Sequence, residues 1–302
     1  MKVAVHGTDC DGIISAALIL LKDPDAEILF VNNPKDALSL METLDVVADL
    51  PKSPNCKANI DHHESNYRKL VEEGRLTEKD LVIPSAPAAA KLVAEYFNLK
   101  GGVADELVEM AVAADTGKHT DKTLKLDRVI KFLHDDDEGR RRLAKILAEK
   151  GASFIEDEWF KEQYSKLKDI EKLEEWLNSV VASLGNVNGA LVFVDEVDAV
   201  PYYMAKDIAH KLLAKGCSAV IVAYKNPESP GKVKLSVRVG EESSIDARII
   251  TEPFGGGGHA KAAGATVEEK DMLWLLRAFA EHSQTKTVLY LRLQPPNPAA
   301  SG

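Results

Sequence analysis

Acidic and imidazole side chains occur at four places in the first 120 residues, each at or just after an apolar segment. They are His6, Asp9 and Asp11 in HGTDCD, Asp49 in VVADLP, Asp61-His62-His63 in ANIDHH, and Asp115 in AVAADTG. Such groups are costly to bury unpaired, and carboxylates gathered together repel one another. Two divalent cations among them would remove that repulsion and activate a water molecule for phosphoryl displacement.

Each motif also has an ordinary structural explanation when it is taken singly. HxxDxD could be a turn with helix-capping aspartates, Asp49 and Asp115 could be cap or turn residues, and adjacent histidines could be structural. Four such motifs in one order are hard to explain by coincidence. We therefore predict a site for two divalent metal ions. Mixed His and Asp ligands favour Mn²⁺, with Co²⁺ and Mg²⁺ as alternatives.

The elements that must position these residues are short apolar strands alternating with helical segments. The sequence predicts strands at 2–5, 27–31, 45–48 and 58–60 and helices at 12–21, 87–97 and 104–113. This alternation predicts an α/β fold with a largely parallel sheet. The carboxyl ends of parallel strands share one edge of a sheet, where such folds bind their ligands.

A change in composition separates two predicted domains. Residues 126–184 alternate charged and apolar residues, as amphipathic connecting helices do, and GNVNG at 185–189 is typical of a linker. We expect a metal-binding domain with its helical connector at 1–185 and a smaller α/β domain at 186–302. Strands at 190–194, 218–224 and 232–239 and helices at 202–214 and 271–282 would build the second.

A run of four glycines in the second half is a candidate ligand-binding loop. Gly256, Gly257 and Gly258 in FGGGGHAKAAG let backbone N–H groups approach a ligand closely, and His259 follows directly. A flexible turn is the alternative explanation. Arg238, in LSVRVG, could hold a phosphate with its guanidinium group, or could be a surface strand residue. His119, Arg248 and Lys261 are weaker candidates for substrate contact.

The ordered motifs resemble those of the DHH phosphoesterase superfamily over almost the whole chain. Asp61-His62-His63 is similar to the naming motif, and the glycine segment is similar to that of the DHHA1 domain. One departure concerns the first motif, which is His-x-x-Asp-x-Asp here and His-x-x-x-Asp-x-Asp in several members. This difference affects the choice of subfamily more than it affects metal binding.

The resemblance implies a set of roles for the residues. It implies one metal held by His6, Asp9, Asp49 and Asp115 or a subset of these, and a second held by Asp11, Asp49, His62 and Asp115. Asp61 would orient a histidine, and His63 would contact a substrate phosphate or protonate the leaving oxygen. Arg238, the glycines and His259 would bind the substrate.

The expected activity is metal-dependent hydrolysis of phosphate esters in short nucleotides, either oligoribonucleotides or 3′-phosphoadenosine 5′-phosphate. Phosphodiesterases for cyclic or linear dinucleotides, a RecJ-like exonuclease and a non-catalytic nucleotide sensor are the alternatives. The formal charge is −10, and residues 186–302 hold 13 Lys and Arg against 13 Asp and Glu, so the excess negative charge lies in residues 1–185. A long duplex would need a basic stripe instead.

Composition limits the remaining classes. The content of 45% hydrophobic and 28% charged residues excludes a disordered chain. A membrane span would need a run of about 18 apolar residues, and the sequence contains none. The three cysteines have no CxxC spacing, which favours a reducing cytoplasm. The expected partner is thus a short nucleotide or oligonucleotide, with neither membrane nor long duplex, and a homodimer is left open.

Overall fold

The chain divides into two units in the computed structural model, Met1–Lys168 and Asp169–Gly302. The structure describes residues 1–167, 170–197, 204–225, 231–282, 285 and 287–293. The division falls before helix α8 (Ile170–Ser183), which the sequence analysis assigned to the first domain. The domain boundary at 185/186 therefore stays a prediction.

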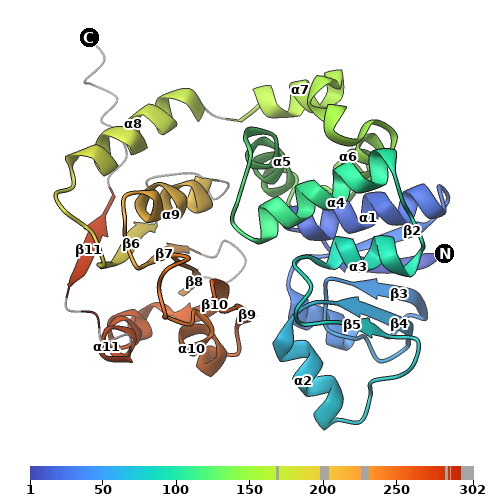
Figure 1. Ribbon diagram of the computed structural model, residues 1–302, viewed down its shortest axis with the longest axis horizontal. Coiled ribbons are helices and arrows are strands. Elements are labelled where there is room, and N and C mark those ends of the chain that lie inside the picture. The colour runs from blue at the N-terminus through green and yellow to red at the C-terminus, as the bar shows by residue number, and fades with distance from the viewer. Residues whose placement is uncertain (168–169, 198–203, 226–230, 283–284, 286, 294–302) are drawn as a thin grey trace. The chain divides into compact units, whose positions relative to one another are not determined.

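Five parallel strands form the sheet of the N-terminal unit (Figure 1). They are β1 (Lys2–His6), β2 (Glu27–Val31), β3 (Leu44–Ala48), β4 (Cys56–Asp61) and β5 (Leu81–Val82). Their order in space is β2-β1-β3-β4-β5. Four of them match the strands predicted from apolar runs, and the parallel α/β class is confirmed for this unit.

Helices and 3₁₀ turns make up the rest of the N-terminal unit. The helices are α1 (Cys10–Lys22), α2 (Glu64–Glu72), α3 (Ala89–Tyr96), α4 (Gly102–Asp115), α5 (Asp121–Phe132), α6 (Asp137–Lys150) and α7 (Glu158–Ser165). The 3₁₀ turns are η1 (Pro34–Ser39) and η2 (Gly151–Glu156). Helix α2 and the two-residue strand β5 were not predicted from the sequence.

Helix α1 is the centre of this unit. It packs against β1 and against α3, α4, α5 and α6, and its residues 10–20 are buried. Asp9 caps the helix by accepting a hydrogen bond from the Gly12 N–H at 3.0 Å, so α1 begins two residues earlier than the apolar run predicted. A Cβ at Gly12 would lie 1.9 Å from the His6 carbonyl oxygen. Glycine therefore allows α1 to start directly against the end of β1.

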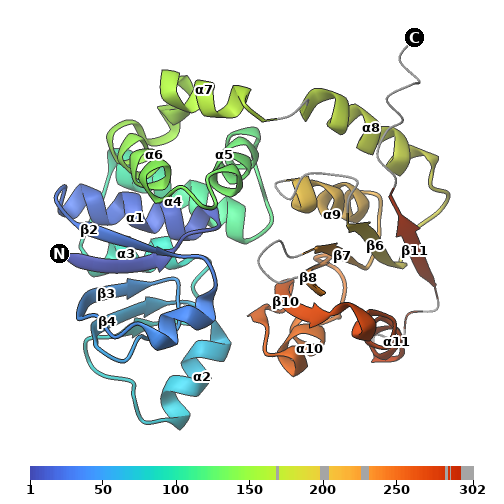
Figure 2. The same cartoon turned by 180° about the vertical axis from the view of Figure 1, so that it is seen from behind.

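A six-stranded mixed sheet forms the C-terminal unit (Figure 2). Its strands are β6 (Leu191–Val197), β7 (Ala219–Lys225), β8 (Lys232–Val239), β9 (Gly257–His259), β10 (Ala262–Glu268) and β11 (Val288–Arg292), and its other helices are α9 (Ala205–Ala214), α10 (Arg248–Thr251) and α11 (Met272–His282), with short 3₁₀ turns at Glu252–Phe254 and Glu269–Asp271. The order is β11-β6-β7-β8-β10-β9. The β11, β6 and β7 strands are parallel, and the remaining pairs are antiparallel.

Alternate residues of β6 and β7 belong to two separate apolar cores. Leu191 and Phe193 pack with residues of α10 and α11, whereas Val192 and Val194 pack with residues of α8 and α9. Both faces of these strands are therefore buried, which is the reason that the strands are apolar throughout. Residues 202–203 of the predicted 202–214 helix lie outside the described residues. Within the described part of the chain, no helix is long and apolar enough to span a membrane.

Candidate metal centre

The strand order of the N-terminal sheet places two of the four motifs side by side. The chain leaves β1 for β2 on one side and later returns to β3 on the other, so β1 and β3 are neighbours whose connections diverge. Open parallel sheets bind ligands at this point, beyond the carboxyl ends of the strands. His6 ends β1, and Asp49 directly follows the last residue of β3.

The first motif spans the turn from β1 into α1. His6 Nδ1 lies 3.0 Å from Asp9 Oδ2 and 3.5 Å from Asp49 Oδ2. Asp11 lies in the first turn of α1 and is buried. Its two carboxylate oxygens accept hydrogen bonds from the backbone N–H groups of Ala89 and Ala90, at 2.6 and 2.8 Å. The first turn of α3 therefore fixes the orientation of the Asp11 carboxylate.

Asp49 lies at the centre of the group and has a strained backbone. Its φ is 57°, in the left-handed region that residues other than glycine rarely adopt. Its side chain is buried, and neither of its oxygens has a hydrogen-bond partner among the described residues. Strain and an unsatisfied buried carboxylate persist only when the surrounding structure or a ligand compensates for them.

The DHH segment presents its two imidazoles differently. His62 Nδ1 lies 3.2 Å from the Ala86 carbonyl oxygen, and its Nε2 lies 3.3 Å from Asp11 Oδ2 and 3.7 Å from Asp49 Oδ1. A hydrogen bond from Nδ1–H to that carbonyl leaves the Nε2 lone pair directed at the carboxylates. This is the arrangement of metal-ligating histidines.

Asp61 is occupied within its own segment. Its Oδ1 accepts from the backbone N–H of His62 at 2.8 Å and from His63 Nδ1 at 2.8 Å, and its Oδ2 accepts from Asn66 Nδ2 at 2.6 Å. The side chain is fully buried. Asp61 therefore holds the histidines in place and binds His63 through its Nδ1.

Asp115, the last residue of α4, completes the cluster. Its Oδ2 lies 3.7 Å from His62 Nε2, and about a quarter of its side chain is exposed. The structure thus brings together His6, Asp9, Asp11, Asp49, His62 and Asp115, which come from four separate parts of the chain. Donor atoms of His6, Asp9 and Asp49, and of Asp11, Asp49 and His62, lie within 4.8 Å of one another.

The pKa values of side chains in the cluster are raised by burial or by neighbouring negative charges. Burial, followed by the negative charge of Asp9, raises the pKa of Asp49 to about 7. Burial and the charge of Asp49 raise the pKa of Asp11 well above its usual value. Burial opposes protonation of His6, but the carboxylates of Asp9 and Asp49 outweigh it and raise the pKa of this imidazole. Protonation reduces the repulsion between the buried carboxylates, as bound cations would. The residues therefore fit divalent metal ions.

The remaining pair has opposite pKa shifts. Burial opposes the charged form of His63, yet the Asp61 carboxylate beside it raises the pKa of the imidazole to about 10. Burial opposes ionisation of Asp61 as well, but His63 and Asn66 outweigh it and lower the pKa of this carboxyl. At neutral pH the pair is an imidazolium held by a carboxylate.

The run of four glycines in the second unit leads into a hairpin of β9 and β10. Gly257–His259 is the edge strand β9, paired antiparallel with β10. A Cβ at Gly256 would lie 2.2 Å from the Gly264 carbonyl oxygen, and a Cβ at Gly258, whose φ is 135°, would lie 2.5 Å from that of Ala262. Close backbone packing therefore explains these two glycines, and their role in substrate binding stays a prediction.

The other predicted substrate residues lie on different elements. Arg238 is half-buried on β8, opposite Ala262, and its Nη1 donates to the Val237 carbonyl oxygen at 2.9 Å. Arg248 pairs with Asp246 at 2.7 Å, and Lys261 Nζ donates to the Gly240 carbonyl oxygen at 3.0 Å. His119 Nδ1 lies 3.2 Å from Thr123 Oγ1.

Sequence reasoning missed a buried arginine that supports the first motif. Arg140 of α6 is only 2% exposed, and its Nη1 donates to the Gly7 carbonyl oxygen at 3.0 Å and to Asn32 Oδ1 at 2.5 Å. Asn66 and the backbone groups of residues 86, 89 and 90 were also missed. No local sequence signal marks Arg140 or the backbone groups, because their partners lie far away in the chain, whereas Asn66 is only five residues from its partner Asp61.

The comparisons with known proteins agree with this architecture. Residues 191–284 match the family model of the DHHA1 domain. A pGpG-specific phosphodiesterase, PggH from Vibrio cholerae, has a similar structure with a TM-score of 0.58 and 19% identity, covering 94% of this chain and 98% of that one. No curated protein matches the chain significantly in sequence.

RecJ from Thermus thermophilus is also similar, in complexes with Mn²⁺ and with Mg²⁺. The TM-scores are 0.50 and 0.51 at 16% and 17% identity, covering 99% of this chain and 55% and 52% of RecJ. This chain thus spans about half of RecJ. Residues 191–284 thus match the DHHA1 model, and the chain shares its fold with PggH and RecJ, in agreement with the resemblance of the sequence motifs to the DHH superfamily.

Proposed function

We propose that this protein is a metal-dependent phosphoesterase that hydrolyses phosphate ester bonds of short nucleotides. The observation that carries the proposal is the buried carboxylate of Asp49, whose oxygens lack hydrogen-bond partners among the described residues while His6, His62 and His63 lie within 3.7 Å. A buried anion in such surroundings fits a bridge between two cations.

His6, Asp9 and Asp49 would hold one metal ion, and Asp11, Asp49 and His62 the second, with Asp115 at the exposed side. Two divalent ions held there would supply the Lewis acidity that ionises a water molecule and stabilises charge on the phosphoryl oxygens. Manganese is the preferred ion, because imidazole ligands suit it better than Mg²⁺.

His63 is the proposed proton donor to the leaving oxygen. Asp61 accepts from Nδ1 of His63 and raises the pKa of the ring to about 10, so Nε2–H would be the group that donates to a phosphate or alkoxide oxygen. The DHHA1 unit would supply nucleotide recognition through Arg238, the glycine hairpin and His259.

Among short nucleotides, a linear dinucleotide is the substrate that we favour. The fold shared with PggH over nearly the full length of both chains favours a linear dinucleotide among the short nucleotides. The similarity to RecJ, an exonuclease, makes the ends of nucleic acids the second candidate substrate. The acidic N-terminal half opposes binding of a long duplex.

Hydrolysis of a nucleotide panel with Mn²⁺, and with chelator in its place, tests the proposal. The panel holds linear dinucleotides, tri- to pentaribonucleotides, a cyclic dinucleotide and 3′-phosphoadenosine 5′-phosphate. Asp49→Asn should abolish turnover and high-affinity Mn²⁺ binding by calorimetry. Asp45→Asn is the matched control, because Asp45 lies in β3, the strand that Asp49 follows, and pairs with Lys57.

Full turnover in Asp49→Asn would refute the site. Tight nucleotide binding with no metal-dependent turnover on any substrate would instead favour a nucleotide sensor.

A further inference from the structure

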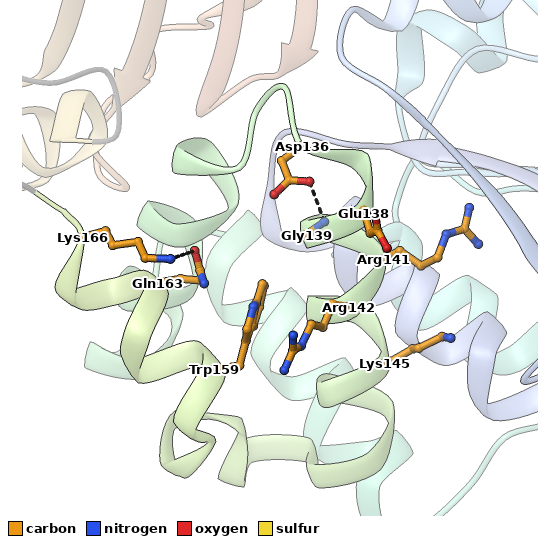
Figure 3. Close-up of a pocket in the computed structure, with 9 residues that line it drawn as sticks. All are labelled: Asp136, Glu138, Gly139, Arg141, Arg142, Lys145, Trp159, Gln163 and Lys166. Atoms are coloured by element: carbon orange, nitrogen blue, oxygen red, sulfur yellow. Dashed lines mark hydrogen bonds between the residues drawn. The ribbon is translucent and has the colours of Figure 1, made fainter.

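A separate cavity of about 520 Å³ lies between α6 and α7 of the N-terminal unit (Figure 3). None of its lining residues belongs to the metal centre. Four lining side chains are basic, namely Arg141, Arg142, Lys145 and Lys166, and two are acidic, namely Asp136 and Glu138. The cavity is therefore cationic although residues 1–185 carry a net charge of −10.

An arginine and a tryptophan form the centre of the cavity. The Arg142 guanidinium carbon lies 5.0 Å from the centroid of the Trp159 ring. Stacking of this kind holds a guanidinium in place and leaves the N–H donors at its edge directed outward. Trp159 is half-buried, so part of its aromatic surface is also accessible.

The four basic residues differ in what already occupies them. Arg141 donates to the backbone carbonyl oxygen of Ile28 at 2.7 Å, which fixes it to the neighbouring strand β2. Lys166 pairs with Glu162 at 2.8 Å and donates to Gln163 Oε1 at 3.2 Å. In the described part of the chain, Lys145 has neither an ion pair nor a side-chain hydrogen bond.

Arg142 and Lys145 are three residues apart on α6 and therefore lie on the same face of the helix. Figure 3 shows both on one side of the Trp159 ring, with Lys166 and Gln163 on the other. The Arg142 guanidinium is turned toward the ring, and the Lys145 side chain is turned away from it (Figure 3). A fork of N–H donors held beside an aromatic ring suits the oxygens of a phosphate group.

We propose that this cavity binds a phosphorylated nucleoside, with its phosphate on Arg142, its base against Trp159, and Lys145 adding positive charge to the same cavity. The size of the cavity favours this class over a bare inorganic anion, which would fill a small part of it. An acidic peptide would use the cations but not the aromatic ring. The proposal is independent of the metal centre and of the reaction there.

Tryptophan fluorescence tests the proposal directly. The chain has three tryptophans, so Trp176→Phe and Trp274→Phe together leave Trp159 as the sole reporter. The ligands are adenosine 5′-monophosphate, adenosine, inorganic phosphate and hexaglutamate, each titrated with chelator present so that no metal reaches the metal centre.

We expect saturable quenching by the nucleotide. Lys145→Glu should weaken binding by about tenfold or more, because it replaces an attraction with a repulsion. Lys91→Glu is the matched control, because Lys91 is an exposed lysine on α3 and reversing its charge should leave the affinity unchanged. Arg142→Ala is the second variant and should also weaken binding.

Several outcomes would overturn the proposal. They are no saturable change, equal affinity in Lys145→Glu and the parent, or adenosine, phosphate or hexaglutamate binding as tightly as the nucleotide. Circular dichroism of each variant distinguishes lost binding from lost folding.

Discussion

Replacing Asp49 by Asn should make the metal-free protein more stable while it abolishes metal binding. The substitution keeps the shape of the side chain and removes a buried negative charge that lies among other carboxylates. Function and stability therefore oppose each other at this residue, and the sign of the stability change tests the electrostatic reasoning.

The magnitude follows from the raised pKa. The pKa of Asp49 is 3.8 in the unfolded chain and about 7 in the folded protein. Because the folded protein holds the proton more tightly, its stability falls as the pH rises from 3.8 to about 7 and the carboxyl group ionises. One unit of pKa is about 1.4 kcal/mol, so the cost is about 2 kcal/mol at pH 5 and approaches about 4 kcal/mol at pH 8. The Asn variant escapes this cost, and its advantage should grow between those pH values.

Urea unfolding in chelator at pH 5 and pH 8 measures the effect. Asp45→Asn is the control. Its carboxylate has a pKa lowered by the hydrogen bond from Lys57, so its loss should be slightly destabilising at both pH values. Saturating Mn²⁺ should stabilise the parent and not the Asp49 variant. An Asp49→Asn protein less stable than the parent at pH 8 without metal would refute the reasoning.

Three further substitutions test polar and packing contacts of the N-terminal unit. Arg140→Lys should lower the free energy of unfolding by about 2–3 kcal/mol and weaken Mn²⁺ binding in calorimetry, because a lysine cannot reproduce the hydrogen bonds of the guanidinium, including that to Gly7; unchanged metal affinity would contradict it. Gly12→Ala should cost at least about 3 kcal/mol in denaturant unfolding, since its Cβ would meet the His6 carbonyl oxygen, and a soluble variant of parental stability would show that the contact is not as close. Burial opposes ionisation of Asp80, but hydrogen bonds from a lysine, a threonine and backbone N–H groups outweigh it and lower the pKa of this carboxyl. Asp80→Asn should therefore destabilise the protein by about 2 kcal/mol at pH 7, and this difference should shrink as the pH falls below about 4. Acid unfolding of both proteins measures it.

Local patterns in the sequence were sufficient for most elements of the parallel sheet. Short apolar runs between polar segments marked β1 to β4, because a strand buried on both faces has few polar residues. The same reasoning missed β5, which has only two residues, and β11, whose burial alternates between exposed and half-buried. Helix α2 was missed because most of its residues are polar and only Leu70 is buried.

Helix boundaries depended on capping contacts. Asp9 extends α1 by two residues beyond the apolar run, and Asp136 and Asp157 cap α6 and α7 in the segment that the sequence showed only as amphipathic. A capping aspartate is recognisable in sequence, but whether it caps, binds a metal or does both depends on its neighbours in space.

Residue type and order in the sequence determined which side chains could form the metal centre. Four motifs of imidazoles and carboxylates follow apolar segments, and the parallel sheet places the strand ends at one edge. Tertiary structure alone decided how these groups are held: the Asp11 carboxylate by the backbone of α3, His62 by the Ala86 carbonyl, and the β1–α1 turn by Arg140. It also decided that α6 and α7 bring four basic side chains and Trp159 to one open cavity. These features depend on backbone groups and on residues far apart in the chain, which come together only when the helices pack.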